Sequence, residues 1–129
     1  IRHPKIQKPL HIQTPVSLID LVPTIYEMLN VNLPKSIDGI SLVKTIKNGS
    51  YDRPYMYGVD KESQYIRVGM MKLIVWVDFT KELYNIAIDP HEQKNLTSQY
   101  PELVDSLYAI MVNHELEQID RALSLLKNE

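Results

Sequence analysis

The spacing of apolar residues between Ser17 and Asn30 is typical of a helix. Apolar residues recur there at intervals of three and four, which predicts a helix with one buried face. The members of this face are Leu18, Leu21, Val22, Ile25, Met28 and Leu29. Because proline is tolerated in the first turn of a helix but not in its interior, we expect a tight turn over 17–21 and a main helix that begins at Pro23.

Two further segments belong to the same half of the chain. Residues 1–15 carry three prolines between alternating polar and apolar positions, so we expect an extended lead-in strand at the edge of a sheet. After the turn dipeptide Asp38-Gly39, Ser41 can cap a short helix that Gly49 closes. The first half therefore contains a lead-in strand and two helices.

The apolar spacing changes to two after residue 53 and predicts short strands. Four such runs follow one another with tight connections, which favours an antiparallel meander. These strands are expected at 55–59, 65–68, 72–77 and 82–87.

A long helix then opens at Tyr100-Pro101, with a possible break near His114. Its predicted apolar stripe is Leu103, Leu107, Ile110, Met111, Ile119, Leu123 and Leu126. One face of this helix should cover the meander, because a single sheet cannot bury itself. The fold class is therefore α+β.

Composition narrows the possible functions. The chain has 129 residues, 44% of them hydrophobic and 23% charged, which permits a packed core. The net charge of −2 argues against nucleic acid as a partner, and no apolar run approaches the roughly 20 residues of a membrane span. The absence of cysteine excludes disulfides, thiolate metal sites and a cysteine nucleophile from this sequence. Since the chain opens in mid-pattern at Ile1, we expect it to be a piece of a longer polypeptide.

Local motifs of catalysis are absent from the sequence. It has no glycine-rich phosphate loop, no HExxH motif and no calcium loop of the DxDxDG type. Arg67 and Lys72 lie on adjacent expected strands and could together hold an anion. Alternatively, they are solvated, or they pair with a structural carboxylate among Glu62, Glu82 and Asp89.

The order of several short motifs resembles the sulfatase family. Asp20-x-x-Pro23-Thr24 and Asp38-Gly39-x-Ser41-Leu42 are similar to two consecutive segments of that family. The hairpin Arg67-x-Gly69-x-x-Lys72 resembles a third segment. The run Glu82-Leu83-Tyr84 followed by Asp89-Pro90-x-Glu92-x-x-Asn95-Leu96 resembles the fourth, with Ile86 where leucine is usual. Together these motifs cover residues 14 to about 100.

The resemblance implies a fold of the alkaline phosphatase superfamily, with a large α/β domain and a smaller C-terminal subdomain. It assigns residues 1–50 to the end of the large domain and residues 51–129 to the subdomain. It also implies a parent hydrolase of sulfate esters that uses formylglycine, made from Cys or Ser in a Cys/Ser-x-Pro-x-Arg motif, and calcium or magnesium. No such motif occurs here. We therefore expect no catalytic residue, no metal ligand and no activity in this chain alone, whose partner would be the remainder of the α/β domain.

Within the resemblance, the motif residues are expected to be architectural, while Arg67 and Lys72 are the candidates for the substrate cleft. The architectural set is Asp20, Pro23, Asp38, Gly39, Asp89, Pro90, Glu92 and Asn95. Two other interpretations stay open: a fragment of a related phosphodiester or phosphonate ester hydrolase, and a self-standing protein-interaction module. A large bare apolar patch on residues 14–48 would favour the enzyme fragment over the module.

Overall fold

The computed structural model describes residue 11 and residues 15–34, 37–49 and 53–127. The chain divides into two compact units, Ile1–Arg53 and Pro54–Glu129. Almost all of the expected lead-in strand lies outside the described residues. The assignment of the first unit to the end of a larger domain stays a prediction.

The first unit is helical, as the spacing predicts. A 3-10 turn, η1 (Leu18–Asp20), leads into α1 (Leu21–Met28), and Pro23 lies in the first turn of α1. The second helix is α2 (Val43–Asn48), and its N-cap residue is Leu42 rather than the expected Ser41. The backbone N–H of Val43 donates a hydrogen bond to Ser41 Oγ at 3.2 Å. It ends at Gly49, whose φ of 74° is favourable for glycine.

The predicted buried face of α1 is wrong. Leu18 is 83% exposed and Leu29 is 68% exposed, and Leu21, Val22 and Ile25 are exposed as well. The buried residues of this segment are instead Asp20, Pro23 and Thr24. Among the described residues, α1 contacts the three-residue η1 and the six-residue α2, which offer too little surface to cover an apolar face.

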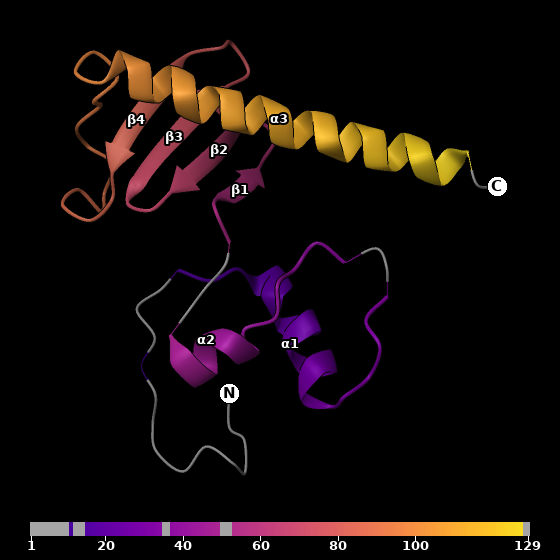
Figure 1. The fold of residues 1–129 in the computed structure, drawn as a ribbon. Helices are drawn as coiled ribbons and strands as arrows, with labels where there is room; N and C mark the ends of the chain where they lie inside the picture. Colours follow the sequence, from indigo (N-terminus) through magenta and orange to yellow (C-terminus); the bar gives the residue numbers. More distant parts are fainter. Residues whose placement is uncertain (1–10, 12–14, 35–36, 50–52, 128–129) are drawn as a thin grey trace. The chain divides into compact units, whose positions relative to one another are not determined.

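The second unit contains the predicted meander, which is confirmed. Its strands are β1 (Met56–Val59), β2 (Ser63–Val68), β3 (Met71–Trp76) and β4 (Lys81–Asn85). They lie in the order β1-β2-β3-β4, and every neighbouring pair is antiparallel (Figure 1). The period-two pattern of the sequence thus corresponds to hairpins between consecutive strands.

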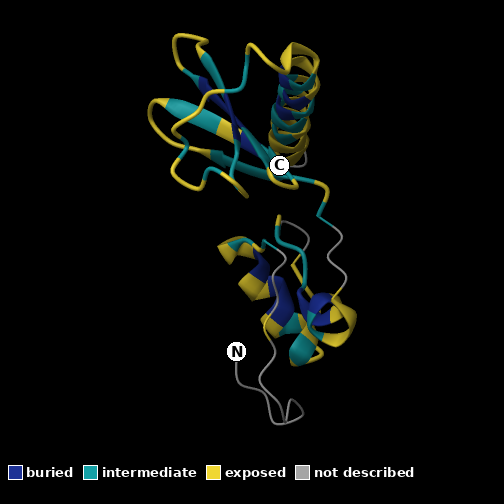
Figure 2. Cartoon of the chain, turned by 90° about the vertical axis from the view of Figure 1, so that its left-hand side faces the viewer, coloured by how far each residue is buried: buried dark blue, intermediate teal, exposed yellow. Residues whose placement is uncertain are grey.

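The long helix α3 (Pro101–Leu126) lies across one face of this sheet (Figure 1). The core forms between the two layers, and Figure 2 shows the buried residues gathered there. Its members are Ile66, Leu73, Val75, Leu83, Val104, Leu107 and Met111. The α+β fold expected from the sequence is therefore confirmed.

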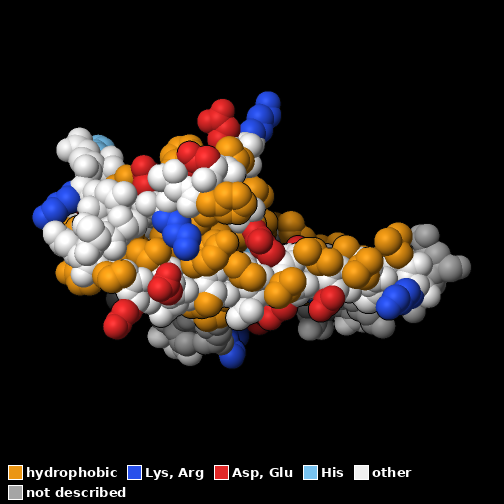
Figure 3. Space-filling model, turned by 90° about the horizontal axis from the view of Figure 1, so that it is seen from above, with side chains coloured by type: hydrophobic (Ala, Val, Ile, Leu, Met, Phe, Trp, Pro, Cys, Tyr) orange, Lys and Arg blue, Asp and Glu red, His pale blue; other side chains and the backbone are white. Residues whose placement is uncertain are grey.

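Two expectations about α3 are wrong. The helix continues through His114 without a break, and the last part of its apolar stripe, Ile119, Leu123 and Leu126, is exposed. A helix of 26 residues is about 39 Å long, whereas four strands span only about 15 Å. The C-terminal part therefore projects beyond the sheet, and hydrophobic side chains lie at its surface (Figure 3).

His114 lies where α3 still covers β1. Its ring lies 4.4 Å from the ring of Tyr57, and its Nδ1 lies 3.1 Å from the hydroxyl of Tyr55. These contacts make it a partly buried structural residue. No helix of the described residues combines the length and the apolar character needed to cross a bilayer.

Candidate functional site

Arg67 and Lys72 lie directly opposite each other in the β2–β3 hairpin. The same row of the sheet continues to Met56 on β1 and to Tyr84 on β4. Side chains alternate between the two faces of a strand, and the neighbouring row with Ile66 and Leu73 faces the core. The row with Arg67 and Lys72 therefore lies on the opposite side, which we call the outer face of the sheet.

Arg67 has no carboxylate partner among the described residues. Its Nε donates to the carbonyl oxygen of Gly69 at 2.9 Å, and its Nη2 lies 3.8 Å from Met70 Sδ. The expected pairing with Glu62, Glu82 or Asp89 is absent from these contacts. The guanidinium is held in place by its own turn and keeps donors for another acceptor.

Lys72, by contrast, is paired, but with a residue outside the expected set. Its Nζ lies 2.7 Å from Glu92 Oε1 and 5.0 Å from the centre of the Tyr65 ring. Glu92 belongs to the loop after β4, and its backbone takes a φ of 55°. The loop geometry, which strand alternation cannot predict, brings this carboxylate to the cation.

The loop over residues 89–96 holds itself together through its polar side chains. Asp89 accepts hydrogen bonds from the backbone N–H groups of Gln93 and Lys94, both at 2.9 Å. The Lys94 and Gln93 amides keep the pKa of the Asp89 carboxyl below its usual value. Since these bonds need the carboxylate, Asp89 stabilises the loop through the neutral pH range, and that contribution is lost as acid protonates it.

Asn95 attaches this loop to the sheet. Its Oδ1 accepts hydrogen bonds from the backbone N–H of Leu83 at 3.2 Å and from that of Thr97 at 3.0 Å. Leu96 N–H donates to the carbonyl of Leu83 at 2.8 Å. Pro90 and Glu92 lie between these two anchors, so the loop presents Glu92 to the outer face.

Tyr84 adds a neutral donor to the row. Burial raises the pKa of its hydroxyl, and the carboxylate of Glu82 raises it further. The phenol is therefore protonated at neutral pH. The outer face thus combines two cations, one of them already paired, with a phenol O–H.

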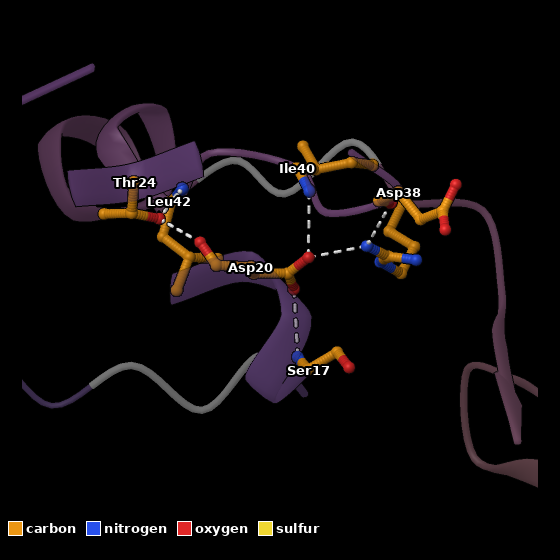
Figure 4. Close-up of polar contacts among 7 residues, drawn as sticks. Ser17, Asp20, Thr24, Asp38, Ile40 and Leu42 are labelled. Atoms are coloured by element: carbon orange, nitrogen blue, oxygen red, sulfur yellow. Dashed lines mark hydrogen bonds and ion pairs between the residues drawn. The ribbon is translucent and has the colours of Figure 1, made fainter. Parts of the chain in front are cut away.

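Asp20 makes polar contacts with several parts of the first unit, as Figure 4 shows. It is fully buried, and its carboxylate accepts the backbone N–H groups of Ser17 and Ile40, each at 2.9 Å. The guanidinium of Arg53 pairs with the same carboxylate and also lies near the carbonyl oxygen of Asp38. One buried carboxylate thereby joins three separate segments of the chain.

Thr24 and Gly39 complete this arrangement. Thr24 Oγ1 donates to the carbonyl of Asp20 and accepts from the N–H of Leu42 at 2.8 Å. A Cβ atom at Gly39 would lie 2.7 Å from the backbone carbon of Ile19 and 2.9 Å from Pro23 Cγ. The first two motifs therefore pack together through a glycine that no larger residue can replace without movement.

Sequence reasoning assigned no role to Arg53 or to the hydroxyl of Thr24, although Thr24 stands in the first motif. Thr24 directly follows the proline of its motif, which is a signal that could have drawn attention to its hydroxyl. Arg53 lies 33 residues from Asp20 and stands in no local pattern. The sequence around either residue contains no pattern that predicts a contact between residues so far apart in the chain.

A metal ion does not fit these residues. Among the described residues, no group of three or more His, Cys, Asp or Glu side chains lies close enough to hold one. The carboxylate of Asp20 is already engaged by two amides and a guanidinium. The calcium or magnesium implied by the sulfatase resemblance therefore stays a prediction for a longer protein.

Known proteins with similar sequences are sulfatases. No protein-family model matches the chain. The chain is 26% identical to Arylsulfatase K of Mus musculus over an alignment of 121 residues, with 81% of this chain and 22% of that protein covered. Arylsulfatase K of Bos taurus is 27% identical over 124 residues, with 83% of this chain and 23% of that protein covered. The chain thus spans less than a quarter of the length of these relatives.

Solved structures share its fold. A putative sulfatase from Bacteroides thetaiotaomicron VPI-5482 superimposes with a TM-score of 0.67 and 23% identity, covering 81% of this chain and 25% of the other. BT4656 in complex with D-glucosamine-2-N,6-O-disulfate gives a TM-score of 0.67 at 22% identity, covering 78% and 24%. A phosphonate monoester hydrolase of Agrobacterium radiobacter gives 0.60 at 18% identity, covering 76% and 24%. In sequence and in fold, the chain resembles the C-terminal portion of a sulfatase.

Proposed function

We propose that this chain forms one wall of the substrate cleft in a sulfatase-like hydrolase of sulfate esters. The observation that carries the proposal is Arg67, a cation on the outer face without a carboxylate partner among the described residues. A guanidinium can donate two parallel hydrogen bonds to the oxygens of a sulfate group. Arg67 is therefore the residue that would hold an anionic substrate group.

Lys72 and Tyr84 would assist from the same row. Lys72 adds positive charge next to Arg67, while its bond to Glu92 fixes the position of the ammonium group. Tyr84 is protonated and can donate a hydrogen bond. The three side chains together offer donors to several oxygens of one tetrahedral anion.

The substrate class that we favour is a sulfated saccharide. The structure of BT4656 contains D-glucosamine-2-N,6-O-disulfate. Another structure with this fold comes from work on the metabolism of multiple glycosaminoglycans by Bacteroides thetaiotaomicron. Both have the fold of this chain, with TM-scores of 0.67 and 0.63. A sulfate on a sugar ring would present the anionic group that suits Arg67.

The catalytic groups would come from the remainder of the α/β domain. Formylglycine would supply the nucleophile, and calcium or magnesium would stabilise charge on the sulfuryl oxygens. The first unit carries a run of exposed apolar residues that suits such a partner: Val16, Leu18, Ile19, Leu21, Val22, Ile25, Leu29, Val31 and Leu33. These exposed apolar residues favour the interpretation that this surface packs against the remainder of a larger domain over that of a self-standing interaction module.

Hydrolysis of a phosphonate ester is the second candidate. The phosphonate monoester hydrolase of Agrobacterium radiobacter shares the fold with a TM-score of 0.60. A phosphonate also presents anionic oxygens to Arg67, so the proposed contact serves both reactions. Parallel assays of an aryl sulfate and an aryl phosphonate with the longer polypeptide separate them.

We expect the purified 129-residue chain to have no aryl sulfatase activity, with or without added calcium or magnesium. The reason is that it contains neither a cysteine nor a serine followed by x-Pro-x-Arg. Release of the phenol from an aryl sulfate, followed by absorbance, measures this activity. Turnover that co-elutes with the chain through a second purification would contradict the expectation.

In the longer polypeptide, Arg67→Ala is expected to lower kcat/KM for a sulfated substrate by roughly 10- to 100-fold without lowering the melting temperature. Arg67→Lys should lose less, because it retains the charge but not the planar pair of donors. Arg121→Ala on α3 is the matched control and should leave kcat/KM unchanged. An Arg67→Ala protein that melts early and retains its kcat/KM would make Arg67 structural.

A further inference from the structure

A groove lies at the end of the sheet next to the β3–β4 turn. Its volume is about 290 Å³, which suits a ligand of roughly one ring in size. Apolar and aromatic residues line it from the strands, from the β3–β4 turn and from α3, namely Val59, Val75, Trp76, Val77, Phe79 and Tyr108. Its polar residues are Asp60, Ser63, Gln64 and Glu115. None of them belongs to the row with Arg67 and Lys72.

Phe79 is an unusual residue for its position in the turn. Its φ is 64°, in the region that favours glycine or asparagine, and its side chain is 75% exposed. The turn itself is well formed, since Phe79 N–H donates to Trp76 O at 2.8 Å and Trp76 N–H to Thr80 O at 2.9 Å. A bulky ring here strains the backbone and gains little packing from the described residues.

The charges in the groove select its ligand. Hydrogen bonds from the Glu62 and Ser63 amides lower the pKa of Asp60, so this carboxylate is ionised at neutral pH. Together with Glu115 it would repel a sulfate group. Lys81 Nζ lies 3.9 Å from the centre of the Tyr108 ring and offsets part of this negative charge beside the groove. A neutral ligand avoids the repulsion that an anion would meet.

The groove offers hydrogen-bond groups that suit hydroxyls. The Gln64 side chain makes no hydrogen bond among the described residues and can both donate and accept. Glu115 accepts one bond from the Tyr57 hydroxyl through Oε1 at 3.3 Å, which leaves acceptor positions on the carboxylate. A pyranose ring combines such hydroxyls with an apolar face of C–H groups that packs on an aromatic ring.

We propose that this groove binds a neutral pyranose unit of a saccharide, with Phe79 as the aromatic platform and Gln64 and the two carboxylates as hydroxyl partners. The site does not depend on sulfate binding at Arg67. It would add affinity for an unsulfated sugar even if the sulfatase proposal fails.

Trp76 makes the test direct, because it is the only tryptophan of the chain and lines the groove. The 129-residue chain is titrated with three unsulfated disaccharides, cellobiose, lactose and N,N′-diacetylchitobiose, by tryptophan fluorescence and ligand-observed NMR. At least one disaccharide should bind saturably with a Kd below roughly 10 mM, because even a Kd of about 1 mM requires only a small binding free energy. The Arg67→Ala variant should bind the same disaccharide with unchanged affinity.

Phe79→Gly separates the binding role from folding. Glycine relieves the positive φ, so the variant should melt at the same temperature or higher, while its affinity falls by roughly tenfold. Gln64→Ala should also weaken binding. Asn30→Gly is the matched control, because Asn30 has a φ of 55° in the first unit and should not affect the titration.

Three results would overturn the proposal. One is the absence of saturable binding by both methods for all three disaccharides. The second is unchanged affinity in Phe79→Gly. The third is binding of sulfated disaccharides alone, lost in Arg67→Ala but not in Phe79→Gly, which would support the proposed function and exclude the groove.

Discussion

Replacing Leu107 with Ala is expected to lower the free energy of unfolding of the second unit by about 2–5 kcal/mol, the usual range for a buried leucine. Leu107 is 2% exposed and packs between α3 and the sheet, in the same cluster as Leu73 and Leu83. Removing its branched end leaves a cavity that the surrounding strands can fill only in part. Urea unfolding followed by circular dichroism measures the loss.

Leu126→Ala is the matched control for this change. Leu126 lies on the same helix but is 70% exposed, where α3 has passed the edge of the sheet. The same chemical change should therefore cost less than about 1 kcal/mol. Equal losses at the two positions would show that the projecting part of α3 is covered in solution.

Asp20→Asn should destabilise the first unit by about 3 kcal/mol, because it removes one partner of a buried ion pair. The amide cannot carry the charge that Arg53 requires. Its NH₂ group replaces one carboxylate oxygen, so the N–H of either Ser17 or Ile40 loses its acceptor. Amide hydrogen exchange should speed up at Ile40 and Leu42. The amides of β2 and β3 should keep their protection, since they belong to the other compact unit.

Glu27→Gln on α1 is the control for the loss of a carboxylate. Glu27 is exposed, so its replacement should leave the exchange at Ile40 unchanged. Retained protection of Ile40 and Leu42 in Asp20→Asn would mean that the buried carboxylate does not hold the segments together. Equal loss across both units would contradict their independence.

Local chemistry made much of this fold predictable. The four strands follow from period-two alternation with short connections, and such hairpins are formed between neighbours in sequence. Gly49 ends α2 and Pro23 lies in the first turn of α1, because backbone restrictions act within a few residues. The loop after Asp89 was also predictable, since its carboxylate binds amides only four and five residues away.

Contacts between distant residues were decided by the tertiary structure alone. The pairing of Asp20 with Arg53 spans 33 residues, and that of Lys72 with Glu92 spans 20. Similarly, the stripes on α1 and α3 have the correct period, yet burial requires an opposing surface, which the described part of the chain provides only under the first half of α3. Periodicity specifies which side chains share a face, whereas only the packed elements determine whether anything covers that face.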